Sequence, residues 1–175
     1  MGNCQTVALC DYISRTPARP DCKWLCVKQK WKEWSDNTNI FGLHQVGRNI
    51  YDSKKFVDIM IQSDYIVYQP HWDTKQLIKK ISDKNEHLLF ITLTPIFVNK
   101  TDFMKRKEKK YNCKISCCNI IKNNKHKTLF LKNDNHPTTF LYLEIIKQIC
   151  NIISIPFFTD SEYIDLLKIQ YPNYQ

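Results

Sequence analysis

The stretch SDYIVYQPHWDTKQLIKKISDKNEHLLFITLTP, at Ser63–Pro95, contains the pattern that decides the fold. Its first and last parts, DYIVYQP and HLLFITLTP, are short runs of apolar and β-branched residues that end at a proline, as buried strands often do. The middle part, DTKQLIKKIS, has apolar residues at helical spacing, with Asp73 or Thr74 as the expected N-cap. The stretch therefore predicts two parallel strands joined by a helix.

The flanking residues extend this alternation. SKKFVDIMIQ, at residues 53–62, predicts another helix directly before the first strand. Nearer the N-terminus, Val7–Ser14 has helical periodicity and Cys22–Lys28 is typical of a short strand, whereas Trp31–Arg48 shows no period and is interpreted as a surface connection. We therefore expect an α/β fold, with a parallel sheet flanked by helices, in one domain that spans residues 1–175.

The second half of the chain is less regular. Thr101–Tyr111 is a charged helix candidate with Thr101 or Asp102 as its cap. The following segment NCKISCCNII, at residues 112–121, fits a helix or a strand equally well. Lys122–Lys127 is polar throughout and predicts a loop.

The chain is basic, with 26 Lys and Arg against 17 Asp and Glu and a net charge of +9, which suits an anionic partner. However, abundant Lys, Asn, Ile and Tyr beside only 3 Gly is also the bias that AT-rich coding produces. The densest basic run, MKRKEKK at Met104–Lys110, includes Glu108, and we interpret it as a solvated helix face. No nucleic-acid recognition module is recognisable, so nucleic acid is not an expected partner.

The sequence shows neither an apolar run long enough to cross a membrane nor a secretory signal, so we expect a soluble, cytoplasmic protein. Its eight cysteines are then expected to be reduced. Their spacings lack the tight CxxC turns of zinc sites, and no metal is expected.

The N-terminal hexapeptide MGNCQT has two interpretations. Gly2 behind a removable methionine, with Thr6 four residues on, fits the N-myristoylation pattern, and Cys4 could take a second acyl chain. Alternatively, Cys4 is a nucleophile at the start of a helix that begins near Gln5. The positive end of that helix would favour a thiolate and hold a developing oxyanion.

Catalysis by a thiol also needs a base, and His136 is the candidate among five histidines. It lies in the turn NDNHPT, ahead of a strongly apolar helix predicted from Thr138 or Thr139 to about Ile153. Asp134, in the same turn, is placed to orient the imidazole. The pair Cys4 and His136 therefore predicts nucleophilic chemistry.

Four segments resemble, in the same order, the landmarks of one family. They are GNCQ (Gly2–Gln5), SDYIVYQP (Ser63–Pro70), LTPIF (Leu93–Phe97) and LFLKNDNHPTTFLYLEIIKQI (Leu129–Ile149). The family is the WcbI-type polysaccharide biosynthesis family, which is assigned to acetyl transfer. The resemblance covers residue 2 to about residue 155, and its specificity lies in the combination of the segments.

The resemblance implies a fold similar to that of the SGNH/GDSL hydrolases, a three-layer α/β architecture. Gly2-Asn3-Cys4 then stands where Gly-Asp-Ser carries the nucleophile, and His136 stands for the late histidine. The hydrolases have an aspartate three residues before that histidine, whereas Asp134 is two before it, so a Cys–His dyad is implied. Family members have a strand before this motif, where only Met1 stands here. The sheet lacks its first strand, or the natural start lies upstream, or the site is not assembled.

The resemblance further implies coenzyme A, as acetyl-CoA, and a hydroxyl acceptor on a saccharide or another molecule. Amide side chains that would hold the substrate or the oxyanion are those of Asn3, Gln5 and Asn135. Gln69 ends its strand at the edge where ligands bind in open α/β sheets, and is expected to face the same crevice. Arg48 is the expected contact of a coenzyme A phosphate.

Two alternatives stay open. A catalytically degenerate relative would bind coenzyme A or another ligand and act as an interaction protein, with a membrane as partner only if Gly2 is myristoylated. A hydrolase of esters or thioesters would use the same Cys–His dyad with water as the acceptor.

Overall fold

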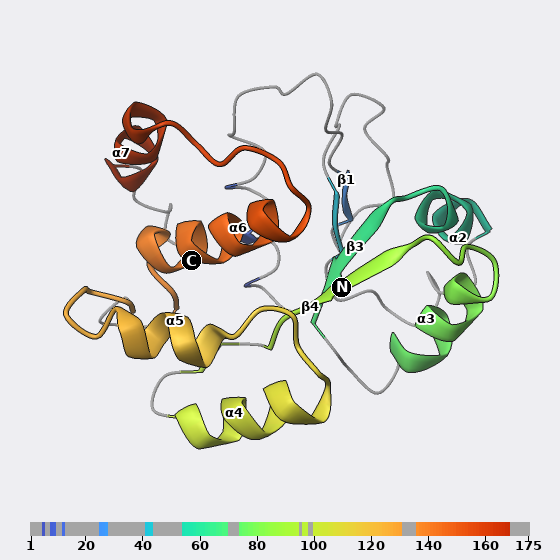
Figure 1. The fold of residues 1–175 in the computed structure, drawn as a ribbon, viewed down its shortest axis with the longest axis horizontal. Coiled ribbons are helices and arrows are strands. Elements are labelled where there is room, and N and C mark those ends of the chain that lie inside the picture. The colour runs from blue at the N-terminus through green and yellow to red at the C-terminus, as the bar shows by residue number, and fades with distance from the viewer. Residues whose placement is uncertain are drawn as a thin grey trace.

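Parallel strands lie between two groups of helices (Figure 1). In the computed structural model, β3 (Tyr65–Tyr68) and β4 (Leu89–Thr92) pair in parallel, with Tyr65 opposite Leu89. A second parallel pair is formed by β1 (Leu25–Val27) and β2 (Phe41–Leu43), and β2 contacts β3. The fold is therefore mixed α/β.

The structure describes residues 5, 8, 9, 12, 25–27, 41–43, 54–69, 74–94, 96, 97, 100–130 and 136–168. The helices with bounds in these ranges are α2 (Lys54–Ile61), α3 (Thr74–Ser82), α4 (Thr101–Lys110), α5 (Cys117–Asn123), α6 (Thr139–Ile152) and α7 (Asp160–Lys168). Across the same ranges, no helix combines the length and the apolar character that a membrane span requires.

The predicted alternation of helix and strand around Ser63–Pro95 is confirmed. The elements α2, β3, α3 and β4 follow one another in the expected order, and the two strands are parallel. The strand predicted in Cys22–Lys28 is β1, and the described residues of Val7–Ser14 are helical. The apolar helix predicted after the NDNHP turn is α6, with Thr138 as its N-cap.

The two faces of the β3–β4 pair pack into different hydrophobic cores. Successive side chains of a strand point to opposite faces, and here Ile66 and Tyr68 pack with α2 and α3. The alternate residues Tyr65 and Val67 pack, with Ile91 of β4, into a larger core formed mainly by α5 and α6, to which α4 contributes Met104. Helices therefore cover both faces of this strand pair, as Figure 1 shows.

The prediction that Trp31–Arg48 is only a connection is wrong, because β2 lies inside it. Three residues are too few to show the alternation that identifies a strand. The strand also contains Gly42, which disfavours β structure locally. Its pairing with β1, in which Phe41 lies opposite Leu25, joins segments far apart in sequence and leaves no local signal.

The predicted cap of α4 is also wrong. Lys100 occupies the N-cap position, and no side chain bonds to the backbone there. Asp102 lies in the first turn instead, where its negative carboxylate interacts favourably with the positive end of the helix dipole. The helix otherwise matches the predicted charged segment.

The segment 112–121, which fitted a helix or a strand, contains both structures. Ile115 forms a parallel bridge to the residue that follows β4. Ser116 then caps α5 by accepting a hydrogen bond from the backbone N–H of Asn119. Because α5 continues to Asn123, the first two residues of the predicted loop Lys122–Lys127 are helical.

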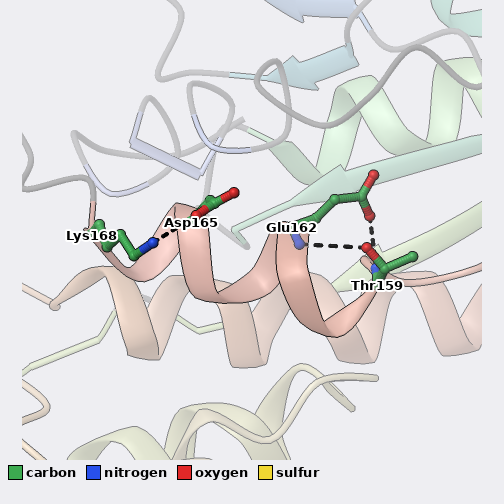
Figure 2. A network of polar contacts seen from close by, with 4 residues as sticks. All are labelled: Thr159, Glu162, Asp165 and Lys168. Carbon is green, nitrogen blue, oxygen red and sulfur yellow. Dashed lines mark hydrogen bonds and ion pairs between the residues drawn. The ribbon is translucent and has the colours of Figure 1, made fainter.

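Helix α7 has no counterpart among the predicted elements. Its N-terminus is a capping box, in which the Thr159 N–H donates to Glu162 Oε2 at 2.7 Å and the Glu162 N–H donates to Thr159 Oγ1 at 3.4 Å (Figure 2). Lys168 and Asp165 form an exposed ion pair at its other end. The T-x-x-E spacing of Thr159 and Glu162 is the signal from which this helix was predictable.

Candidate functional site

Buried polar side chains gather where β3 and β4 end. Gln69 directly follows β3 and is 3% exposed, and Thr94 lies beyond β4 and is 1% exposed. The strand ends are held together, because the Leu93 N–H donates to the Tyr68 carbonyl at 3.2 Å. In parallel sheets this carboxyl-terminal edge is where ligands bind, so the edge is the candidate site.

Gln5 joins this edge from the other end of the sequence. Its Nε2 donates to the carbonyl oxygen of Ile96 at 2.5 Å, and its Oε1 accepts from the N–H of the same residue at 2.7 Å. The side chain of Gln5 is buried among these contacts. The GNCQ segment is therefore attached, through Gln5, to the LTPIF segment that leaves β4.

The helical segment that starts near Gln5 packs along one face. The residues Gln5, Ala8, Leu9 and Tyr12 are helical and buried, at the spacing of one helix face. Tyr12 is fully buried, and its hydroxyl forms a hydrogen bond with Thr139 Oγ1 at 2.5 Å. Its ring also lies 5.5 Å from that of Tyr142. The segment thus connects the end of β4 with the start of α6.

His136 lies three residues before the α6 residue that Tyr12 contacts. It is half-buried and precedes Pro137, which pairs with Phe130 in an antiparallel bridge. Two hydrogen bonds reinforce this bridge: the Thr138 N–H donates to the Leu129 carbonyl, and the Thr138 hydroxyl donates to the Thr128 carbonyl, both at 2.9 Å. The backbone on the C-terminal side of His136 is therefore fixed.

Three of the predicted site residues lie within the described ranges. The structure places Gln5 and Gln69 beside the ends of neighbouring strands, and it places His136 at the base of α6. The amide of Gln5 is used within the fold, and its predicted contact with a cofactor stays a prediction. The others lie outside the described residues: Asn3, Cys4, Arg48, Asp134 and Asn135.

Glu108 is a polar residue at this edge that the sequence did not single out. Its carboxylate accepts hydrogen bonds from the Thr94 hydroxyl at 3.4 Å, the Ser116 hydroxyl at 2.9 Å and the Cys118 N–H at 3.0 Å. It therefore links the chain after β4 to the N-terminus of α5, where a negative charge is favoured. No periodic signal in the sequence marks such a contact.

The cysteines near α5 are poor nucleophiles. Burial, followed by the negative charge of Glu108, raises the pKa of the Cys113 thiol from 9.0 to about 11, and the same causes raise the pKa of Cys118 to about 11. The same two causes also raise the pKa of Cys117, which is fully buried. These thiols stay protonated near neutral pH, where a nucleophile must be a thiolate.

The described ranges contain no group of three His, Cys, Asp or Glu side chains that could hold a metal ion. Comparison of the sequence with protein-family models, with curated proteins and with solved structures gives no match.

Proposed function

We propose that the protein is an acyltransferase of the WcbI type, which transfers an acetyl group from acetyl-CoA to a hydroxyl of a saccharide. One observation carries the proposal: the segment that begins at Gln5 contacts both Ile96 and the start of α6. Two segments that resemble the family's landmarks, GNCQ and LTPIF, are therefore in contact across 91 positions through Gln5 and Ile96. Tyr12, seven residues after Gln5, contacts Thr139 in the last such segment across 127 positions.

The chemistry proposed for this site has two steps. The Cys4 thiolate attacks the acetyl carbonyl, so that a thioester to Cys4 forms, the bond to the coenzyme A sulfur breaks, and coenzyme A leaves as its thiolate and takes up a proton. The acceptor hydroxyl then attacks this thioester and gives its proton to the imidazole of His136. An ester forms, and the Cys4 thiolate is restored.

The fold proposed for the whole chain is the three-layer arrangement of the SGNH hydrolases. Helices on both faces of the β3–β4 pair support it. So does the position of Gln69 at the edge where ligands bind in such sheets.

The test is coenzyme A release from acetyl-CoA in the presence of a saccharide acceptor. Cys4→Ala and His136→Ala should each lower the rate by roughly 100-fold or more. His126→Ala is the matched control, because His126 is exposed on the turn after α5, and it should keep the wild-type rate. Equal release by all four proteins would exclude the dyad, and equal release with and without acceptor would show a hydrolase instead.

A further inference from the structure

Helix α4 presents a nearly uniform positive charge to solvent. Met104 is its only buried residue. Five of its ten residues are basic, and none of them forms an ion pair within the part of the chain that the structure describes: Lys105, Arg106, Lys107, Lys109 and Lys110. Such a density of like charge on one short helix favours an anionic partner.

The one carboxylate inside the basic run does not neutralise this surface. Glu108 turns toward Thr94, Ser116 and the N-terminus of α5, where its oxygens accept three hydrogen bonds. The run is the solvated helix face that its sequence predicted, but Glu108 turns from that face toward α5. The remaining acidic residue, Asp102, lies in the first turn.

Lysine side chains lie over aromatic rings on α4 and at both of its ends. The Phe97 ring packs edge-on against the Phe103 ring at 5.7 Å. Lys107 Nζ lies over the Phe103 ring at 5.4 Å and over the Tyr111 ring at 5.5 Å. Lys100 Nζ lies over the Phe97 ring, and Lys110 Nζ lies over the Tyr111 ring. We call these six residues the α4 row: Phe97, Lys100, Phe103, Lys107, Lys110 and Tyr111.

The α4 row begins beside the candidate site. Its first ring, Phe97, follows Ile96, the residue that Gln5 holds. The Phe97 N–H donates to the sulfur of Met104 at 3.3 Å, which anchors the start of the row to α4. From Phe103 to Tyr111 the row extends roughly 12 Å along the helix. It is long enough for an extended chain and longer than a single small anion needs.

We propose that the α4 row binds the acceptor, and that the acceptor is an anionic polysaccharide. This inference rests on the acyltransferase proposed above and names its substrate class. Lysine ammonium groups pair with carboxylates or phosphates, and the aromatic rings beneath them hold these ammonium groups in a row. The position of the row next to the candidate site favours the substrate over other polyanions.

The test measures binding of the whole protein to polygalacturonate, an anionic polysaccharide, and to uncharged dextran, without acetyl-CoA. The test variant is the triple change Lys100→Gln, Lys107→Gln and Lys110→Gln. The matched control removes the same charge from the other side of the fold, through Lys79→Gln, Lys80→Gln and Lys84→Gln, which are all exposed. Polygalacturonate should bind, dextran should not, and only the α4 variant should lose about tenfold or more in affinity.

Several outcomes overturn the inference. Equal losses in both variants would show attraction to the net charge alone. Tighter binding to an oligo-dT strand, or to vesicles of phosphatidylserine and phosphatidylcholine, would assign the row to another partner. Weaker binding of acetyl-CoA by the α4 variant would assign it to the donor. Selective polygalacturonate binding without any Cys4-dependent coenzyme A release would remove the acyltransferase and leave only a polyanion surface, so the two failures are distinguishable.

Discussion

Gln5 and Ile96 exchange two hydrogen bonds through a single side-chain amide, across 91 positions of sequence. The amide satisfies both the N–H and the carbonyl of Ile96, as a neighbouring strand would do for one residue. Both residues are buried, and Ile96 is 2% exposed. The pair therefore fixes the N-terminal segment at the edge of the sheet where the candidate site lies.

Replacing Gln5 by leucine should destabilise the protein by about 3 kcal/mol, because it leaves two buried backbone groups of Ile96 without partners. The free energy of unfolding in urea measures this effect. Gln62→Leu is the control, because Gln62 is exposed at the end of α2, and it should change stability by about 0.5 kcal/mol or less. The same loss in both variants would show that the Gln5 amide contributes nothing specific.

Removal of the Tyr12 hydroxyl should lower the free energy of unfolding by about 1 kcal/mol, since it breaks the part-buried hydrogen bond to Thr139 while the ring stays packed on Tyr142. A double-mutant cycle of Tyr12→Phe and Thr139→Val isolates this bond. The two changes should be less costly together than the sum of their separate costs. Simple additivity in urea unfolding would contradict the contact.

The sequence predicted the elements of the central region because each carries its own periodic signal. The stretch Ser63–Pro95 shows strand, helix and strand in its pattern of apolar residues, and α2, β3, α3 and β4 follow it. It could not predict β2, which is short and depends on β1 for its pairing. The contact of Tyr12 with Thr139 joins positions 127 apart, and a contact of that kind leaves no trace in local periodicity.

The candidate site was predictable only as a set of residue types. His136 stands out in the sequence because it precedes a strongly apolar helix, and α6 begins where that pattern indicates. The inward turn of Glu108 was not predictable, since a glutamate within a run of lysines fits a solvated face equally well. Its three hydrogen-bond donors come from two different segments of the chain, the residues after β4 and the N-terminus of α5.

Cys113 and Cys118 should resist alkylation by iodoacetamide in the folded protein. Burial and Glu108 raise the pKa of each thiol from 9.0 to about 11, so the folded thiolate fraction at about pH 8 should be about 100-fold below that of the unfolded chain. Reactivity in the folded state should therefore rise with pH up to about 11, whereas in urea it should level off near 9.0. Pulse labelling with peptide mass spectrometry measures both, and identical pH profiles would contradict the raised pKa values.

Thr159→Ala should destabilise the protein by about 1 kcal/mol, because it removes the side-chain acceptor of the capping box that starts α7. Thr101→Ala is the matched control. Thr101 is the first residue of α4, where no side-chain cap is made. Its replacement should leave the urea midpoint almost unchanged. An equal shift in both variants would show that the α7 cap does not stabilise the fold.

Transfer of an acetyl group to Cys4 is the step on which the proposed function depends. Incubation of the wild-type protein with acetyl-CoA and no acceptor, followed by peptide mass spectrometry, tests it most directly. The proposed chemistry predicts a hydroxylamine-sensitive acetyl group on Cys4 and none on Cys113 or Cys118, whose thiols stay protonated. An unmodified Cys4, or equal acetylation of all three cysteines, would contradict it.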